Sequence, residues 1–258
     1  MYQNILLTLA YDGRNFHGFQ AQSGMRTVAG VLTKAVEKVL GKKTRLIAAG
    51  RMDAGVHAQG QIVNFLADTL IPASAFAYHL YPYLPDDLQV LSSQALPLNF
   101  HARFHSIAKT YRYDFVEAKR IHPKYRDFLP TCTYPLDPDA VGQGAKLFQG
   151  RHNFSAFTLA DEDRDPIRTI FSFDLDRKFW TEGEGCLWTF RIRGDSFLRE
   201  QVRLMVGAMV ALGRGKWTLE EVQSLIDQGA EHSPFMAAPP QGLTLDEVEW
   251  VFPKENIL

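Results

Sequence analysis

The segment 49–58 combines an arginine, an aspartate and a histidine with two glycines in the sequence AGRMDAGVHA. Glycine lets the backbone adopt unusual dihedral angles or approach a ligand closely. A carboxylate on such a loop, here that of Asp53, is a candidate nucleophile or general base, and Arg51 could hold a phosphate group. The alternative is a turn with a solvated carboxylate. The spacing alone leaves both interpretations open.

The hydrophobic pattern predicts the elements that must position this loop. Apolar and β-branched runs predict strands at 2–11, 44–49, 61–66, 89–96, 108–116, 167–175, 187–192 and 245–251. Apolar residues at helical spacing predict helices at 27–40, 73–83, 137–148, 196–212 and 218–227. Loops are expected at 118–132 and 160–164, and a turn at 183–185. The loop at 49–58 therefore lies between two strands.

Each half of the chain alternates strands with one or two helices, which predicts two α+β halves, 1–105 and 106–258, with mixed or antiparallel sheets. No low-complexity linker separates them, so we expect a shared sheet or a large interface. The composition, 46% hydrophobic and 22% charged, excludes a disordered or fibrous chain. Neither an apolar membrane span nor a secretory signal is expected. The two cysteines are expected to be reduced thiols in the cytosol.

The net charge of -1 by itself argues against a nucleic-acid partner, but the charged residues are distributed unevenly along the chain. Residues 1–60, 101–126 and 191–216 carry net charges of +5, +5 and +4, and the segments between and after them are acidic. Phosphate binding depends on the local density of lysine and arginine. Three basic blocks could form one positive face, although solvated surfaces would explain the same pattern.

Six segments resemble, in order along the chain, motifs of the TruA family of tRNA pseudouridine synthases. Segment 50–58, GRMDAGVHA, is similar to the family signature GRTDAGVHA. The others are YDGRNFHGFQ at 11–20, FHARF with KTYRY at 100–113, GRHNFSAF at 150–157, SFLREQVRLMVG at 196–207 and APPQGLTL at 238–245. One such segment would be weak evidence, whereas six in order are specific.

This resemblance implies a fold of two ferredoxin-like halves sharing a mixed, mostly antiparallel sheet, with helices on one face and a central RNA-binding cleft. It implies a cytoplasmic homodimer that isomerises uridines 38, 39 and 40 in the anticodon stem-loop of tRNA. No cofactor, metal or membrane is implied. Two competing hypotheses are a non-catalytic tRNA-binding or tRNA-folding protein and another carboxylate enzyme such as a glycosidase, which usually needs two carboxylates.

The resemblance also assigns roles to single residues. Asp53 is the essential carboxylate, Arg203 its cationic partner and Tyr111 the active-site tyrosine that stacks on the uracil. Further substrate contacts are expected from Arg51, Arg14, Arg103, Lys109, Arg112 and Leu245, and more weakly from Lys119, Arg120, Lys124 and Arg126.

Ordinary structural roles compete with several of these assignments. Arg203 and Arg199 are four apart on the predicted helix and share a face, but Arg203 could also be a surface arginine. On the same helix Val202, Met205, Met209 and Leu212 form an apolar stripe, and Gly207 is expected to allow close packing of the helix on the sheet. Tyr111 could be a half-buried strand aromatic, and so could Tyr113 on the same strand face. His57 and His152 are expected to be hydrogen-bonded structural groups.

Three positions depart from the family pattern: Met52 replaces threonine before the aspartate, Phe19 replaces tryptophan, and Gln201 replaces methionine. The change to Met52, next to Asp53, could alter the reaction rate or the range of uridines that are modified.

Overall fold

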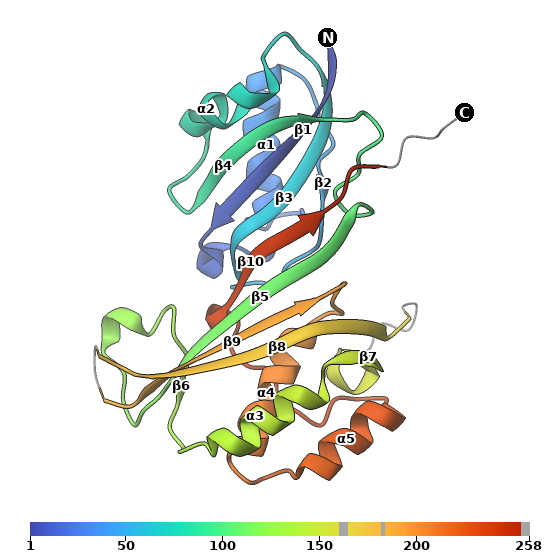
Figure 1. Cartoon of the computed structure of the whole chain (residues 1–258). Helices are drawn as coiled ribbons and strands as arrows, with labels where there is room; N and C mark the ends of the chain where they lie inside the picture. Colours follow the sequence, from blue (N-terminus) through green and yellow to red (C-terminus); the bar gives the residue numbers. More distant parts are fainter. Residues whose placement is uncertain (160–164, 182–183, 254–258) are drawn as a thin grey trace. The chain divides into compact units, whose positions relative to one another are not determined.

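The computed structural model describes residues 1–159, 165–181 and 184–253, and the chain divides into two compact units (Figure 1). Unit 1 comprises Met1–Lys109 and Leu245–Leu258, and unit 2 comprises Thr110–Thr244. This division differs from the expected halves 1–105 and 106–258, because it falls inside a strand and assigns the end of the chain to unit 1. The expected loop at 160–164 and part of the turn at 183–185 lie outside the described residues. Among the described helices, none is long and apolar enough to cross a membrane.

Unit 1 is built on the strands β1 (Tyr2–Tyr11), β3 (His57–Asp68) and β4 (Leu88–Leu96), with β10 (Leu243–Trp250) beside β3. Their order is β4-β1-β3-β10, and the short β2 (Ile47–Ala48) pairs with β3. The β1–β3 and β1–β4 ladders are antiparallel. The loop at 49–56 connects β2 to β3, as expected for the segment that carries Asp53.

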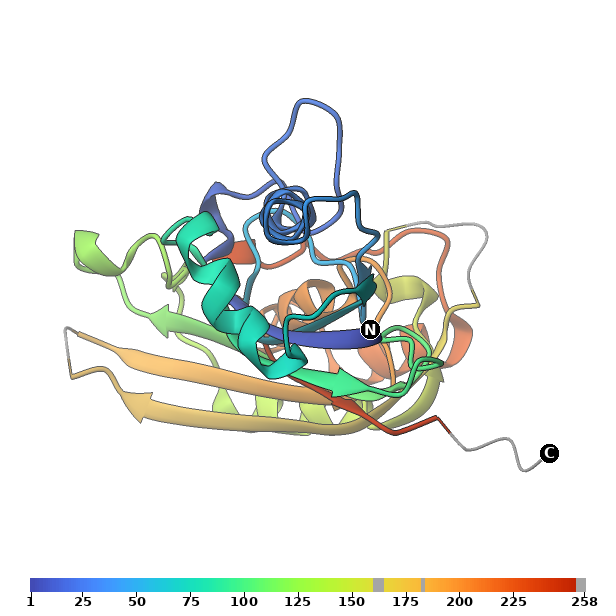
Figure 2. The same ribbon diagram turned by 90° about the horizontal axis from the view of Figure 1, so that it is seen from above.

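The helices α1 (Val28–Leu40) and α2 (Phe76–Leu80) lie on the same side of the strands of unit 1 (Figure 2). Helix α1 begins after Thr27, whose Oγ1 accepts the N–H of Gly30 at 3.2 Å, and it ends at Gly41 in the left-handed conformation. Its buried residues, Val28, Leu32, Ala35 and Val36, recur at helical spacing. The expected helix at 27–40 is therefore confirmed.

Unit 2 contains β5 (Ser106–Glu117), β7 (Gly150–Asn153), β8 (Ile167–Phe179) and β9 (Cys186–Gly194) in the order β5-β9-β8-β7. Strand β5 begins in unit 1. The β7–β8 and β8–β9 ladders are antiparallel, whereas β6 (Thr131–Cys132) pairs in parallel with β5.

The helices of unit 2 are α3 (Pro138–Leu147), α4 (Gln201–Gly213) and α5 (Leu219–Gln228), and they gather on one side of β7–β9 (Figure 1). The apolar residues expected to form a stripe on α4 are all buried: Val202, Met205, Met209 and Leu212. The mixed, mostly antiparallel strand pairing with packed helices confirms the α+β fold.

Three expected elements differ from the structure. The helix expected at 196–212 begins only at Gln201, because Glu200 is in the left-handed conformation (φ 59°) and the Gln201 side chain accepts the N–H of Leu198 at 2.8 Å. The helix expected at 73–83 is split into α2 and flanking 3-10 turns, since Pro82 cannot continue a helix. The strand expected at 44–49 is only the two residues of β2.

Candidate active-site residues in the two units

The start of the Asp53 loop is fixed by side chains from neighbouring strands. The carbonyl oxygen of Ala49 accepts a hydrogen bond from Lys109 Nζ at 3.0 Å, and that of Gly50 accepts one from Gln61 Nε2 at 3.0 Å. Gln61 is fully buried, so its amide would be costly without such partners. These two bonds hold the backbone immediately before Arg51.

Two further carbonyl groups of the loop, those of Met52 and Asp53, also accept hydrogen bonds. The carbonyl oxygen of Met52 accepts the N–H of Phe19 at 3.0 Å, and that of Asp53 accepts the N–H of Val56 at 3.3 Å. The Asp53 side chain is half-buried and that of Arg51 is exposed. The loop therefore presents a carboxylate from a fixed backbone, as a reacting group requires.

Two glycines allow residues 13–19 to pack closely against this loop. A Cβ on Gly13 would lie 2.0 Å from the carbonyl oxygen of Val56, and one on Gly18 would lie 2.8 Å from that of Met52. Gly18 also has a φ of +77°, which other residues rarely adopt. Any side chain at either position would push the Asp53 loop away.

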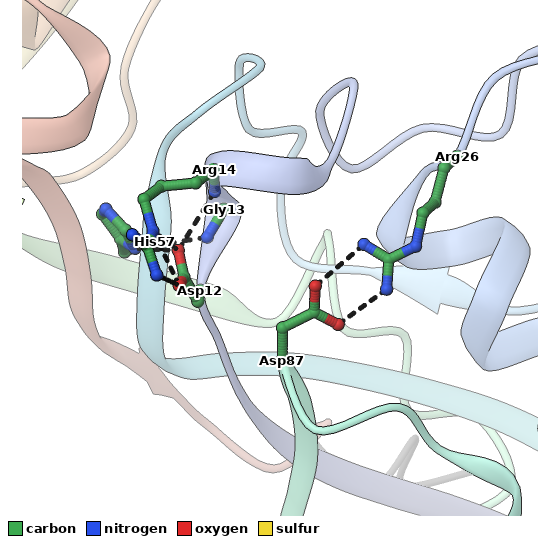
Figure 3. Close-up of polar contacts among 6 residues, drawn as sticks. All are labelled: Asp12, Gly13, Arg14, Arg26, His57 and Asp87. Atoms are coloured by element: carbon green, nitrogen blue, oxygen red, sulfur yellow. Dashed lines mark hydrogen bonds and ion pairs between the residues drawn. The ribbon is translucent and has the colours of Figure 1, made fainter. Parts of the chain in front are cut away.

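His57 joins the end of the loop to the turn after β1 (Figure 3). Its Nδ1 lies within hydrogen-bond distance of the Gly13 N–H, at 3.2 Å. The carboxylate of Asp12 lies 3.3 Å from the same nitrogen. These contacts agree with the expected structural role of His57.

Asp12 is held mainly by Arg14, whose Nε lies 3.0 and 2.9 Å from the two carboxylate oxygens and whose Nη2 lies 2.6 Å from Oδ2. Burial raises the pKa of Asp12, but the hydrogen bonds from Arg14 and the charge of His57 outweigh burial and lower the pKa below its ordinary value. In this structure Arg14 therefore binds a carboxylate of its own chain, although it was expected to contact the substrate.

A second ion pair, between Arg26 and Asp87, fixes the chain after the segment 13–19 that packs on the Asp53 loop (Figure 3). Arg26 donates to both carboxylate oxygens of Asp87, at 2.9 and 2.7 Å, and its guanidinium lies 4.0 Å from the ring centre of Phe16. Its backbone carbonyl accepts the N–H of His17 at 2.8 Å. The segment that packs on the Asp53 loop is thus tied down at Asp12 and at Arg26.

In unit 2, Tyr111 is a buried residue of β5 whose ring packs edge-on against Phe197, with ring centres 5.0 Å apart. Tyr113 lies on the same face and donates its hydroxyl to the carbonyl oxygen of Pro239 at 2.9 Å. Burial raises the pKa of Tyr113. Tyr113 is a strand aromatic as expected, but it is 1% exposed and so more buried than expected.

Arg203 lies in the first turn of α4, with its side chain 13% exposed. Its Nε donates to the carbonyl oxygen of Ala238 at 2.7 Å, and its Nη1 lies 3.2 Å from Oε1 of Glu200. Arg203 is therefore a largely buried cation with a fixed orientation, and the alternative of a surface arginine is wrong.

Two expectations for α4 need correction. Arg199 does not share a helix face with Arg203, because it precedes the helix and uses its carbonyl oxygen to accept the hydroxyl of Thr158 at 2.9 Å. Gly207 was expected to permit close packing between helix and sheet. A Cβ there would instead lie 2.1 Å from the carbonyl oxygen of Met236, so the close neighbour is the backbone of a loop.

The remaining residues expected to contact the substrate lie in different surroundings. Arg112 pairs with Asp114 and points to the opposite face of β5 from Tyr111, since side chains alternate along a strand. Leu245 is 1% exposed and belongs to the core, whereas Arg103 is exposed. His152 bonds the carbonyl oxygen of Gln149 through Nε2 at 2.8 Å, as expected for a structural histidine.

Three partners were missed by sequence reasoning: Asp12, Gln61 and Glu200. Asp12 was expected only as part of the motif at 11–20, and a glutamine within an apolar strand was the available signal for Gln61. Nothing in the sequence indicated that Glu200 would contact Arg203, because the contact depends on the left-handed backbone conformation of Glu200. Among the described residues, no three His, Cys, Asp or Glu side chains are close enough together to hold a metal ion.

Comparison with known proteins gives a consistent result. A family model described as tRNA pseudouridine synthase matches residues 8–105 and 145–250, which include Asp53 and Arg203.

Three relatives, each named tRNA pseudouridine synthase A, match over nearly their whole length. The protein from Acetivibrio thermocellus is 35% identical over 247 residues, covering 95% of this chain and 99% of its own. That from Citrifermentans bemidjiense is 37% identical over 248 residues, covering 95% and 97%. That from Maridesulfovibrio salexigens is 38% identical over 247 residues, covering 94% and 89%.

Proposed function

Because this chain belongs to the tRNA pseudouridine synthase family, we propose that it isomerises uridine to pseudouridine in tRNA, with Asp53 as the essential carboxylate. The observation that carries the assignment is the Asp53 loop itself. Its carbonyl groups at Ala49, Gly50, Met52 and Asp53 are all hydrogen-bonded, while the Asp53 side chain stays half-buried. The targets proposed are uridines 38, 39 and 40 of the anticodon stem-loop.

The reaction is an isomerisation and needs no co-reactant. The bond between C1′ and N1 breaks, the uracil turns, a bond forms between C1′ and C5, and the proton on C5 moves to N1. Asp53 either attacks C1′ to form a glycosyl ester or removes the C2′ proton to form a glycal. Both roles require the ionised carboxylate, which a neighbouring cation favours.

Tyr111 and Arg203 are proposed to act on the same nucleotide as Asp53. The Tyr111 hydroxyl would take the C5 proton once the new bond has formed, and its ring would pack against the uracil. Arg203 would favour the ionised form of Asp53, as the family resemblance implies. Arg51 and Arg103 are exposed and suited to phosphate contacts.

The experiment is to incubate the purified protein with unmodified tRNA and to map pseudouridine by chemical labelling and primer extension. Wild-type protein should modify the anticodon arm. Asp53→Asn should reduce the rate at least 1,000-fold, because it removes the reacting group, while tRNA binding persists. Asp86→Asn, the same substitution at an exposed position, is the matched control. No product with wild-type protein, or full activity in Asp53→Asn, would refute the proposal and favour a tRNA-binding protein without catalysis.

Assembly and cellular location are proposed on the family resemblance. We expect a homodimer, which light scattering of the purified chain would test against the monomer mass of 29.2 kDa. A cytoplasmic location is supported by the free thiols of Cys132 and Cys186, which suit a reducing compartment.

A further inference from the structure

The turn between β4 and β5 is held by two buried asparagines of unit 1. Asn4 and Asn64 are each 1% exposed. Asn4 Nδ2 donates to the carbonyl oxygens of Pro97 and Phe100, both at 2.9 Å, and Asn64 Nδ2 donates to Asn4 Oδ1 at 2.8 Å. Asn64 Oδ1 accepts the N–H of Ala102 at 2.9 Å. A satisfied, buried network of this kind fixes a single backbone conformation.

This fixed turn projects an aromatic ring into solvent. Phe104 is 74% exposed, whereas Phe100 in the same turn is 3% exposed. The Phe104 ring stacks on the imidazole of His101, with ring centres 4.2 Å apart and planes 24° apart. The Phe104 N–H also donates to the His101 carbonyl oxygen at 3.0 Å. One face of the ring is therefore supported from within the chain, and the other remains open.

The surroundings of this ring are positively charged. Arg103 precedes it and is exposed. Burial lowers the pKa of His101, a backbone hydrogen bond opposes that shift, and neighbouring positive charges, among them Arg103 and Arg45, lower the pKa further. His101 therefore supports the Phe104 ring, and these two arginines supply positive charge near it. An open aromatic face beside cations is the arrangement that binds unpaired bases of nucleic acids.

We propose that Phe104 is a base-stacking contact for tRNA, positioned by Asn4 and Asn64, and that Arg103 binds a phosphate beside the stacked base. This inference rests on the proposed function for the identity of the RNA. It adds a stacking residue to the electrostatic contacts expected from the arginines, and it commits to a base that is unpaired in the bound tRNA.

The test measures binding of fluorescently labelled, unmodified tRNA by anisotropy. Phe104→Ala should raise Kd roughly 5- to 100-fold, the range typical of losing one aromatic–base stack. Phe104→Trp should bind within twofold of wild type, and Phe104→Leu should be weakened like the alanine variant, because leucine keeps the apolar bulk but lacks the π-face. The matched control is Phe179→Ala, since Phe179 is also 74% exposed but lies at the end of β8.

Salt dependence separates stacking from charge. Arg103→Gln should reduce the slope of log Kd against log salt concentration by about 1, the effect of one lost phosphate contact, whereas Phe104→Ala should leave that slope unchanged. Equal binding by Phe104→Ala and wild type, or wild-type binding by Phe104→Leu, would overturn the proposal. Urea unfolding of each variant identifies any loss that comes from misfolding, and Phe104→Trp then decides the question.

Two further readouts separate base stacking by Phe104 from catalysis and from contact between two copies of the chain. If wild-type protein binds tRNA but makes no pseudouridine, the proposed function fails, yet weaker binding by Phe104→Ala would still support stacking. If light scattering shows that Phe104→Ala converts a dimer into a monomer, the ring covers a second copy of the chain and the stacking proposal is wrong.

Discussion

Phe19 donates its backbone N–H to the carbonyl oxygen of Met52 at 3.0 Å, so the residue directly before Asp53 is held through its main chain. The approach is close because Gly18 has no side chain and adopts a φ of +77°. The position of Asp53 therefore depends on a segment more than thirty residues earlier in the chain.

Substituting Gly18 tests this dependence against an internal control. Gly18→Ala and Gly24→Ala both place a side chain at a φ near +75°, which should cost each variant roughly 1 kcal/mol of stability. Only at Gly18 does the new Cβ lie 2.8 Å from the Met52 carbonyl oxygen, since Gly24 has open space around it. We expect kcat for pseudouridine formation to fall at least 10-fold in Gly18→Ala and less than twofold in Gly24→Ala. Equal kcat values would show that the contact is dispensable.

Met52→Thr, which restores the residue usual in the family, should change stability more than rate. The Met52 side chain is 7% exposed, so a smaller and more polar residue should cost about 1–3 kcal/mol in urea unfolding. Because the main chain of residue 52 holds the loop, we expect kcat to change less than threefold. A rise of 10-fold or more would mean that the threonine hydroxyl contributes to the reaction.

The elements were predictable wherever the apolar spacing is uninterrupted, as in α1. The prediction for α4 failed at its start, where Phe197 and Leu198 continue the apolar pattern into a segment that is not helical. A hydrogen bond to the Gln201 side chain and the left-handed backbone of Glu200 decide that boundary. Hydrophobic periodicity does not predict a side-chain hydrogen bond or a single left-handed residue, so it could not predict where α4 begins.

For the candidate site, the motif located the Asp53 loop but not the groups that hold it. Lys109 and Gln61 reach the loop from β5 and β3, so their roles depend on how the strands pair. The opposite placement of Arg112 and Tyr111 was predictable, because neighbouring strand residues face opposite sides. The resemblance to the family predicts which residues belong to the site, but it does not predict the direction in which each side chain points.

Asp12 should make stability depend on pH at the acidic end. The folded state lowers the pKa of Asp12, chiefly because the hydrogen bonds from Arg14 outweigh burial. A depressed carboxylate pKa contributes stability above the unfolded pKa of about 4, and that stability is lost as pH falls through the folded value. We expect Asp12→Asn to lose roughly 1 kcal/mol at pH 7 in urea unfolding, and the difference from wild type to shrink below pH 4. A difference that is constant with pH would exclude the carboxylate charge as its cause.

The Arg26–Asp87 pair should contribute a measurable coupling energy because its geometry is bidentate. Arg26→Lys keeps the charge but loses the paired N–H donors and the stacking on Phe16. A double-mutant cycle with Asp87→Asn should give a coupling of about 1 kcal/mol, modest because both side chains are partly exposed. A coupling near zero would show that the bidentate geometry adds nothing beyond what a lysine–aspartate pair supplies.

Glu200 should act as a positioning residue for Arg203. It is the only non-glycine among the described residues with a positive φ, and its carboxylate lies 3.2 Å from Arg203 Nη1, with both side chains less than one-fifth exposed. Glu200→Gln keeps the backbone strain and removes the charge, whereas Glu200→Asn also relieves strain, because asparagine tolerates the left-handed conformation. If the carboxylate orients Arg203, both variants should lower kcat about 10-fold with little change in KM, and Glu200→Asn should be the more stable. If kcat is unchanged in Glu200→Gln, the Ala238 carbonyl oxygen alone suffices to orient the guanidinium.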